Sequence, residues 1–453
     1  MVKIFPAKLR IALVVGLVNS LCFSLVINAT EQIEETTLSE PLPLEELRTF
    51  AEVYNRIKSS YVEDVDDQAL LNGAIAGMLD SLDPHSSFLN KEDYSNVQDL
   101  SSGQYGGLGI EVIPENDALT IISPIDDSPA QRAGILPGDQ IVKVNNTPLR
   151  KIKAQDALDL MRGEIGETVH LSIRRDGENK LLEFALIREI IRLSSIQSKW
   201  LGNGIAYLRI TQFQHRTGND LAAAISTLAE QGDRKITALV LDLRNNPGGV
   251  LFSAEAVSDA FLEQGLIVST RGKTTSSNTE SFAKKGDLLN GAPMVVLINN
   301  GSASASEIVA GALQDQGRAI IMGTRSFGKG SVQTLISIGE NTALKLTTAR
   351  YYTPGGRSIQ GSGIVPDIVV RQTELLSSED KKGGVFESDL KGALANENVN
   401  DNEELSSKKL ANKKEIELLL DNDFQLSEAV NLLRSINILS LTTSKKVLQS
   451  KEQ

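Results

Sequence analysis

Two apolar strands that each run into a helix through an Asn-Gly turn constrain the fold more than any other feature. Residues 238–243 and 294–298 are almost uninterrupted apolar runs, each followed by two asparagines and by glycine. Helices are expected from residue 250 and over residues 304–316. Buried strands that alternate with helices are typical of a mostly parallel sheet covered by helices. The sequence therefore predicts an α/β domain, which we assign to residues 191–370.

A different pattern precedes this domain, at residues 103–190. A Gly-rich turn opens it, short alternating runs predict strands, and one amphipathic helix is expected over residues 154–161. The strands are expected at residues 108–113, 119–122, 140–144 and 169–174. This combination predicts a compact, β-rich α+β module ahead of the α/β domain.

The N-terminal residues resemble a targeting segment. Lys3, Lys8 and Arg10 precede a mostly apolar run, and Ala29 is a small residue at a plausible cleavage point. Residues 1–29 are therefore expected to be a signal peptide or an uncleaved anchor, and either implies that the remainder of the chain is exported.

The segments that flank the two domains are more polar. Residues 30–102 are expected to form a linker and an N-terminal helical subdomain, since apolar residues recur at helical spacing as far as Leu82. Residues 371–453 form a charged C-terminal tail with one terminal helix, in which Leu426, Val430 and Leu433 share a face. This helix either packs on the body of the protein or mediates self-association or adaptor binding.

Charge and composition exclude several classes of protein. With 46 basic and 58 acidic residues the net charge is −12, which disfavours a general nucleic-acid binder. The one cysteine, Cys22, excludes an intramolecular disulfide and a thiolate metal cluster. His85, His170 and His215 are the only histidines, and the zinc-binding pattern HExxH is absent. We expect no metal and no cofactor.

The segment NNGSASASEIVAGALQD, residues 299–315, is the most informative candidate site. It sets a serine on a sharp strand-to-helix turn, where free backbone amides could stabilise an oxyanion. An ordinary helix start explains the string equally well, with Ser304 and Glu307 as a capping box. The string by itself does not distinguish Ser302, Ser304 and Ser306 as the functional serine.

The segment GTRSFGKGSVQ, residues 323–333, comes close to a phosphate-binding P-loop. Gly330 stands where the metal-binding hydroxyl should be, and the residues that follow predict strands instead of the required helix. An ATPase is therefore disfavoured. Lys329 is either an ordinary turn lysine or a base, because a desolvated lysine has a lowered pKa and its neutral amine can accept a proton.

A third segment, LDLRNNPGGV at residues 241–250, ends a strand in a turn whose glycines allow the backbone to present amides to a ligand. By itself this pattern is weak, because many α/β loops contain Pro-Gly-Gly.

Together these segments resemble the C-terminal processing peptidases, or tail-specific proteases, which are serine peptidases with a Ser-Lys dyad and an inserted PDZ domain. The resemblance extends over residues 50–370 and includes FAEVYNRIKSSYVEDVD, LDPHSSFL, YGGLGIEV, AGILPGDQIVKVN, LDLRNNPGG, GSASASEIVAGALQDQGRA, FGKGSVQT and YYTPGGRSIQGSGIVPDIVV, in family order. It implies a crotonase-like α/β core with an inserted PDZ domain and an N-terminal helical subdomain.

The resemblance also assigns roles to residues. It implies Ser304 as the nucleophile, Lys329 as the general base and Gln333 as the residue that orients the lysine. The oxyanion amides would be that of Ala305 and that of Gly248 or Gly249.

Residues 103–190 resemble the PDZ domain of this family. The resemblance implies that the amides of Leu108, Gly109 and Ile110 bind the terminal carboxylate of a peptide. The peptide would add as a strand beside residues 108–113, under the helix over residues 154–161. The expected partners are therefore proteins or peptides with free, apolar C-termini.

The scarcity of histidine agrees with a lysine base. A Ser-His-Asp peptidase needs a histidine beside its serine, but only His215 lies in the α/β domain, where we expect it in a surface turn. The expected protein is an exported serine endopeptidase of the bacterial periplasm, either free or held at the inner membrane by its N-terminus. The alternative is a catalytically inactive PDZ scaffold that only binds peptides.

Overall fold

A computed structural model describes residues 42–115, 118–125, 127–231, 235–339, 341–373 and 407–449. The expected signal peptide or anchor lies outside the described residues, as does most of the expected linker. The chain divides into two compact units, Met1–Gly77 and Met78–Gln453. Within the described residues, no helix is both long and apolar enough to cross a membrane.

The part of the first unit that the structure describes, residues 42–77, is mainly helical, as its periodicity predicts. Helix α2 is Leu44–Ser60, and α3, Asp67–Asp80, begins in this unit. An ion pair of 2.6 Å between Lys58 and Asp67 joins the two helices. No residue of α2 is buried.

The module that resembles a PDZ domain is built on a sheet in the order β3-β4-β5-β7-β8, with β6 paired to β5. Its predicted strands and helix are confirmed, except that the first strand begins at Ile110 instead of Leu108. The strands are β3 (Ile110–Glu115), β4 (Ala118–Pro124), β5 (Gln140–Val144), β6 (Thr147–Pro148), β7 (Thr168–Arg174) and β8 (Leu182–Ile187). The helices are α5 (Pro129–Arg132), η1 (Leu149–Lys151) and α6 (Ala154–Met161). Strands β2 (Gln104–Gly107) and β9 (Glu189–Arg192) pair with each other where the chain enters and leaves the module.

The α/β domain is built on a second sheet, in the order β10-β11-β12-β15-β16-β19. Its strands are β10 (Ile196–Trp200), β11 (Ile205–Ile210), β12 (Ala238–Asp242), β15 (Met294–Ile298), β16 (Ile320–Gly323) and β19 (Ile368–Val369). All neighbours are parallel except β10 and β11. Every residue of β12 and β15 is buried, which explains their continuous apolar runs.

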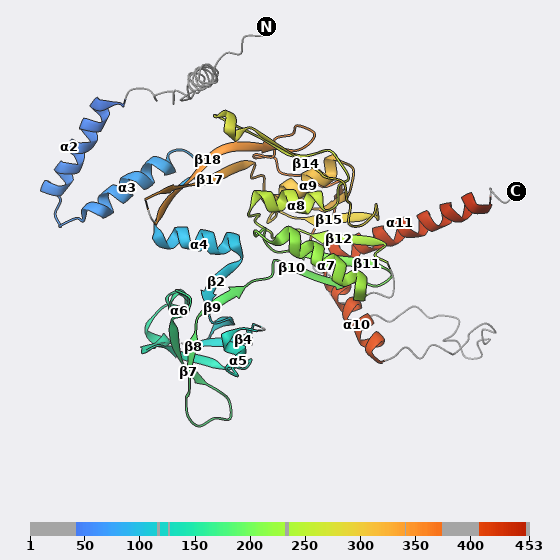
Figure 1. Ribbon diagram of the computed structural model, residues 1–453, viewed down its shortest axis with the longest axis horizontal. Helices are drawn as coiled ribbons and strands as arrows, with labels where there is room; N and C mark the ends of the chain where they lie inside the picture. Colours follow the sequence, from blue (N-terminus) through green and yellow to red (C-terminus); the bar gives the residue numbers. More distant parts are fainter. Residues whose placement is uncertain are drawn as a thin grey trace, which may run out of the picture. The chain divides into compact units, whose positions relative to one another are not determined.

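Helices cover both faces of this sheet (Figure 1). Helices α7 (Thr217–Gln231), α8 (Leu251–Asp259) and α9 (Ala305–Asp315) pack on one face. On the other face lies α11 (Phe424–Gln449), which follows α10 (Ser407–Asn422). Leu426, Val430 and Leu433, the shared face expected from the sequence, are buried against strand residues such as Val240 and Val295. The terminal helix therefore packs on the sheet of the α/β domain.

A third sheet completes the domain, with the order β1-β18-β13-β14 and β17 paired to β18. Its strands are β1 (Ser87–Leu89), β13 (Leu266–Gly272), β14 (Thr279–Phe282), β17 (Ser331–Ile338) and β18 (Thr342–Tyr352), and η2 (Thr275–Ser277) precedes β14. Strand β1 comes from the segment that the sequence assigned to the helical subdomain. It pairs with β18 through Ser87 and Lys345. Helix α4 (Lys91–Ser102) then leads from β1 to β2.

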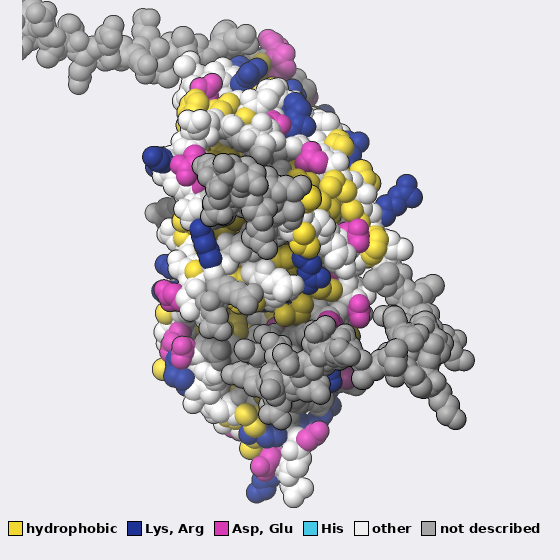
Figure 2. Space-filling view, turned by 90° about the vertical axis from the view of Figure 1, so that its right-hand side faces the viewer, with side chains coloured by type: hydrophobic (Ala, Val, Ile, Leu, Met, Phe, Trp, Pro, Cys, Tyr) yellow, Lys and Arg dark blue, Asp and Glu magenta, His cyan; other side chains and the backbone are white. Residues whose placement is uncertain are grey.

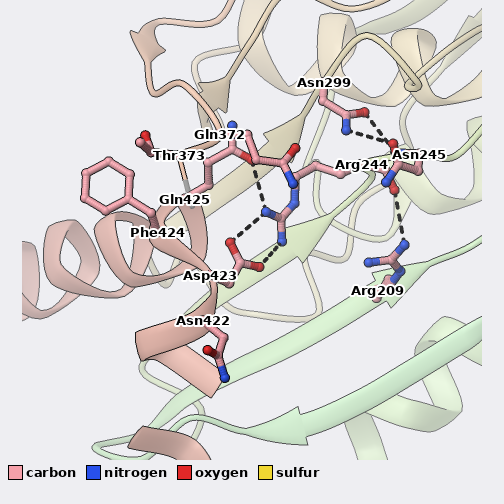
Figure 3. A pocket seen from close by; sticks show the side chains of 10 residues that line it. All are labelled: Arg209, Arg244, Asn245, Asn299, Gln372, Thr373, Asn422, Asp423, Phe424 and Gln425. Carbon is pink, nitrogen blue, oxygen red and sulfur yellow. Dashed lines mark hydrogen bonds and ion pairs between the residues drawn. The ribbon is translucent and has the colours of Figure 1, made fainter. Parts of the chain in front are cut away.

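The C-terminal helices are anchored at the carboxyl end of β12 by a buried ion-pair network (Figure 3). The Arg244 guanidinium bonds to both oxygens of Asp242 and both oxygens of Asp423, at 2.6–2.9 Å. Although burial opposes its charge, these partners raise the pKa of Arg244. The network borders a pocket of about 230 Å³. Its lining residues are Arg209, Arg244, Asn245, Asn299, Gln372, Thr373, Asn422, Asp423, Phe424 and Gln425.

The surface carries charges of both signs. On the face that Figure 2 shows, basic and acidic side chains are interspersed among apolar and neutral ones. A surface mixed in this way lacks the continuous positive stripe that nucleic acid would require on that face.

Candidate active site

Ser304 lies at the junction of β15 and α9, in a backbone conformation that is rare for serine. Its φ is 56° and its ψ is −114°. Such strained conformations cluster at functional sites. Ser302 and Ser306 are fully buried, and their hydroxyls donate to the backbone carbonyls of Leu243 and Asn246. Ser304 is partly exposed, so the structure separates the three serines that the sequence left equivalent.

The capping-box interpretation of this turn also has support, because the Glu307 carboxylate accepts from the Ser304 amide at 2.8 Å. The same carboxylate accepts from the Ser326 hydroxyl and from the amides of Gly328 and Lys329, at 2.6–2.9 Å. Glu307 is fully buried. Burial raises its pKa, and these hydrogen bonds oppose the shift. One buried carboxylate thus joins the serine turn to the lysine loop.

Lys329 lies in the loop between β16 and β17. A P-loop would require a helix after this loop, and the strand β17 found there confirms that the P-loop resemblance is superficial. The lysine is partly buried. Burial, and secondarily the positive charge of Lys345, lower its pKa. Tyr351, whose ring is almost fully buried, donates its hydroxyl to the Lys329 carbonyl oxygen.

The Asn-Asn-Pro-Gly-Gly turn lies directly against Ser304. Gly248 has a φ of +100°, and a β-carbon at this position would lie 2.7 Å from the Ser304 Cβ and 2.9 Å from the Ala305 nitrogen. The Gly248 amide already donates to the Asn246 side chain, at 2.9 Å. Within the described residues, no hydrogen-bond acceptor is found for the amides of Gly249 and Ala305. Of the two glycines that the sequence offered, Gly249 is therefore the one with an uncommitted amide.

Asn246 holds this turn and the serine turn together. Its side-chain oxygen accepts from Gly248, and its side-chain amide donates to the Ile210 carbonyl, at 2.9 Å each. Its backbone carbonyl accepts from the Ala303 amide and from the Ser306 hydroxyl, at 3.0 Å each. Asn246 is fully buried, so the two turns form one hydrogen-bonded unit.

Gln333 lies on β17, in the strand that follows Lys329. Its side-chain nitrogen donates to Ser331 Oγ at 2.9 Å and to Thr347 Oγ1 at 3.3 Å. Both bonds are made by the side-chain nitrogen of Gln333, and its side-chain oxygen takes part in neither.

Sequence reasoning missed a turn that lies close to Lys329. Asp83 and His85 belong to the segment before β1 and interact electrostatically with Lys329. The Asp83 charge raises the pKa of Lys329. The pKa of His85 is lowered mainly by burial and secondarily by the Lys329 charge. The signal was present in the string LDPHSSFL, but placing it required the pairing of β1 with β18. His215, in contrast, is exposed in a turn, as expected.

The three residues expected to bind a peptide carboxylate lie between β2 and β3. Leu108 is buried, Gly109 has a φ of +74°, and Ile110 begins β3, which is an edge strand. The carbonyls of Leu108 and Gly109 accept from the amides of Ala130 and Ile125. Leu108 shares a core with Ala157 and Met161 of α6. An extended peptide could therefore add to β3 beside α6.

No group of three or more His, Cys, Asp or Glu side chains suited to a metal ion is found in the described part of the chain. The chemistry that the arrangement offers is acyl transfer: the hydroxyl of a partly exposed serine, a lysine with a lowered pKa, and backbone amides for which the described residues supply no acceptor. Fold and site together define a serine-type peptidase with a PDZ module.

Comparisons with known proteins identify the family. Residues 204–370 match Peptidase family S41, residues 106–186 match the PDZ domain, and residues 22–93 match the activating protease CtpB N-terminal domain. The chain is 46% identical over 400 residues to the carboxy-terminal-processing protease of Bartonella bacilliformis, with 88% of this chain and 91% of that protein covered.

Two further similar proteins are also carboxy-terminal processing proteases. The chain is 35% identical over 317 residues to the carboxy-terminal processing protease CtpA of Bacillus subtilis, with 70% and 67% of the two chains covered. It is 37% identical over 306 residues to the carboxyl-terminal-processing protease of Synechocystis sp., with 66% and 70% covered. The chain belongs to the C-terminal processing peptidases of family S41. The expected α/β core with a PDZ domain is confirmed, and a scaffold without activity is not favoured.

Proposed function

We propose that Ser304 and Lys329 form the catalytic dyad of this peptidase. The neutral Lys329 amine accepts the proton of the Ser304 hydroxyl as Oγ attacks the scissile carbonyl carbon. The resulting ammonium returns the proton to the leaving nitrogen as the C–N bond breaks, and water then hydrolyses the acyl-enzyme with Lys329 again as base. The observation that carries this proposal is that the buried Glu307 carboxylate bonds to the backbone amides of both Ser304, which is partly exposed and strained, and Lys329, whose pKa is lowered.

The oxyanion of the tetrahedral intermediate is bound by backbone amides. The Ala305 amide is the first of helix α9, where helix N–H groups have no partner within the helix. The second donor is the Gly249 amide, since that of Gly248 is committed to Asn246. Gly248 leaves the space in front of Ala305 open because it has no side chain.

The PDZ module selects the substrate by its end. The amides of residues 108–110 bind the terminal carboxylate, and the last residues of the substrate add as a strand to the free edge of β3. We expect an apolar terminal side chain there, because Leu108, Ala157 and Met161 belong to the apolar core beneath this edge. The enzyme then cleaves within or near the captured tail.

The site of action is proposed to be the bacterial periplasm, because the basic residues and apolar run at residues 1–29 fit an export signal or anchor. An adaptor or a second copy that binds the C-terminal helix is part of the same proposal. It would use another surface of α11, since Leu426, Val430 and Leu433 are buried within the chain.

The dyad is tested by incubating the full chain with an unfolded protein that has an apolar C-terminus. Ser304→Ala, Lys329→Ala and the double variant should each lose turnover to the same extent, because nucleophile and base act as one unit. Lys329→Arg should also fail, since guanidinium does not lose its proton. Lys273→Ala, at an exposed lysine, should retain activity. Strong cleavage by Lys329→Ala would remove the lysine from the mechanism.

Tail recognition is tested with the inactive Ser304→Ala chain and one peptide in free-acid and amidated forms. Charge-assisted hydrogen bonds contribute about 1.5–3 kcal/mol each, so amidation should weaken binding about tenfold or more. A peptide with a terminal acidic residue should also bind less well, because the groove would desolvate that charge without a partner. Equal affinities for the two forms would mean that the module does not read the chain end.

A further inference from the structure

The turn that contains Asp83 is the strongest feature that the mechanism above does not use. The Asp83 carboxylate accepts from the amides of His85 and Ser86, at 2.8 and 3.1 Å, and from the Ser86 hydroxyl at 2.7 Å. These bonds close a compact turn on which β1 begins. A fourth donor comes from 264 residues away: Thr347 Oγ1 donates to Asp83 at 3.1 Å.

The protonation state of Asp83 follows from these contacts. Burial disfavours its charge, but the hydrogen bonds from Ser86, His85 and Thr347 outweigh that effect and lower its pKa. Asp83 is therefore an ionised acceptor near neutral pH, and it has no proton to give. Consequently the hydroxyl proton between Asp83 and Thr347 belongs to Thr347.

Thr347 is placed by strand pairing. On β18 it lies opposite Gln333 of β17, and the register shifts between Val332 and Gln333 so that Thr348 is an extra residue on β18. Bulges of this kind re-aim side chains next to active sites. From the other side, the Ser86 hydroxyl accepts from the Thr347 amide at 3.1 Å. Thr347 is thus held by both neighbouring segments.

The bond direction at Thr347 determines the orientation of the Gln333 amide. Because the Thr347 hydroxyl proton is committed to Asp83, the Thr347 oxygen can only accept from Gln333. It does so from the Gln333 nitrogen at 3.3 Å. The amide is therefore held with its nitrogen toward Thr347, and its oxygen takes part in neither of the bonds to Ser331 and Thr347.

We propose that Asp83 is a positioning residue for catalysis, which acts through Thr347 to fix the orientation of the Gln333 amide and thereby the acceptor presented to Lys329. This inference rests on the proposed role of Lys329 as the base and on the role that the family resemblance implies for Gln333, which is to orient that lysine.

Asp83 also contributes a charge near the lysine. The charged groups that act on Lys329 are Asp83 from the turn before β1 and Lys345 from β18, which raise and lower its pKa respectively. His85 is affected by Lys329, Asp83 and Lys345. Glu307 bonds to the Lys329 amide from helix α9. Removal of the Asp83 charge should therefore lower the pKa of the amine, whereas removal of the Thr347 hydroxyl should disturb orientation only.

The test compares threonine variants in the full chain. Thr347→Val keeps the shape but removes the hydroxyl, and we expect kcat to fall about tenfold to a hundredfold with KM unchanged, as for a misplaced catalytic group. Thr347→Ser keeps the hydroxyl and should restore kcat. Thr348→Val is the matched control: this threonine bonds to Thr334, which is next to Gln333 on β17 and therefore faces the opposite side of the sheet from Gln333. This control should have the wild-type kcat.

Asp83→Asn supplies a readout that a merely structural role would not change. Its oxygen can still accept from Thr347, so kcat at high pH should be largely retained, while the apparent pKa for activity should move to lower pH. If Thr347→Val has the wild-type kcat, the inference is overturned; an unchanged apparent pKa in Asp83→Asn would overturn the effect of the Asp83 charge on Lys329. Should Thr347→Val not fold, Asp83→Ala, which removes the acceptor of the Thr347 hydroxyl, takes its place, and a wild-type kcat would overturn the inference. Lys329→Ala is measured in parallel. If Lys329→Ala is active, the proposed catalytic dyad is wrong. If Lys329→Ala is inactive and Thr347→Val has the wild-type kcat, only the positioning role of Asp83 through Thr347 is wrong.

Discussion

Replacing Gly248 with alanine tests the assignment of the oxyanion site most directly. A methyl group at this position would lie 2.7 Å from the Ser304 Cβ and from the Ala303 carbonyl oxygen, and 2.9 Å from the Ala305 nitrogen. Contacts below 3.0 Å force a shift of the backbone that presents the Ala305 amide. The methyl group would also occupy the space in which the oxyanion must form.

Two effects of this substitution have separable magnitudes. Alanine at a φ of +100° strains the backbone, and such strain costs about 1–3 kcal/mol. In a domain of this size each kcal/mol lowers Tm by about 2–4 °C. The loss of one oxyanion donor costs about 2.7–4 kcal/mol in the transition state, so kcat should fall about a hundredfold to a thousandfold.

The assay measures kcat on an unfolded protein substrate and Tm by circular dichroism, for Gly248→Ala beside Gly202→Ala. Gly202 has a φ of +83° in the turn before β11, and a β-carbon there meets nothing within 4 Å. This control should reproduce the backbone strain and keep kcat. If Gly248→Ala lost no more activity than Gly202→Ala, the space in front of Ala305 would not be the oxyanion site.

Three further predictions follow from charged groups. Burial and Lys345 lower the pKa of Lys329, and the base must be neutral. Activity should therefore rise with pH, with an apparent pKa below the free-lysine value of about 10.4. A profile governed by a group with a pKa near about 6.5, and lost in His215→Ala, would contradict this. In Glu307→Gln, an –NH2 group would face two of the four donors that now bond to the carboxylate. The substitution should therefore lower the free energy of unfolding by about 1–3 kcal/mol and reduce kcat. An unchanged Tm would refute the role of Glu307 as a bridge between the two turns. Burial opposes the charge of Asp423, but Arg244 lowers the pKa of this carboxyl. The ion pair therefore stabilises the fold above the unfolded pKa of about 3.9, and this stabilisation is lost as the pH falls through the lower pKa of the folded state. Asp423→Asn should lower Tm at pH 7, and the difference in Tm from the wild type should shrink in acid.

Local pattern predicted the elements that position the candidate site. The strand over residues 294–298 and the strand that begins at residue 238 were identified because strands buried on both faces have continuous apolar sequences. The start of α9 was expected from turn residues and from Glu307, three positions after Ser304. These signals reside within a few residues of one another, so a single sequence contains them.

The residue types of the site, and the family that they indicate, could be predicted from the sequence. It offered three serines, two glycines and one lysine, and its scarcity of histidine disfavoured a histidine base beside the serine. The structure then distinguished Ser304 from the other two serines, because Ser302 and Ser306 are buried and donate their hydroxyls to backbone carbonyls. A hydrogen bond to Asn246 separated the glycines.

Contacts between distant segments could be decided only by the tertiary structure. Asp83 meets Thr347 because β1 pairs with β18, and that pairing joins residues more than 250 positions apart. Asp423 reaches Arg244 because an apolar helix face covers the sheet. Such contacts depend on how the helices and strands pack against each other in the folded protein. The residues of a short polar motif do not indicate which distant segment will pack beside it. The chemistry of this protein is therefore visible in its motifs, whereas the groups that orient and tune that chemistry are visible only in the fold.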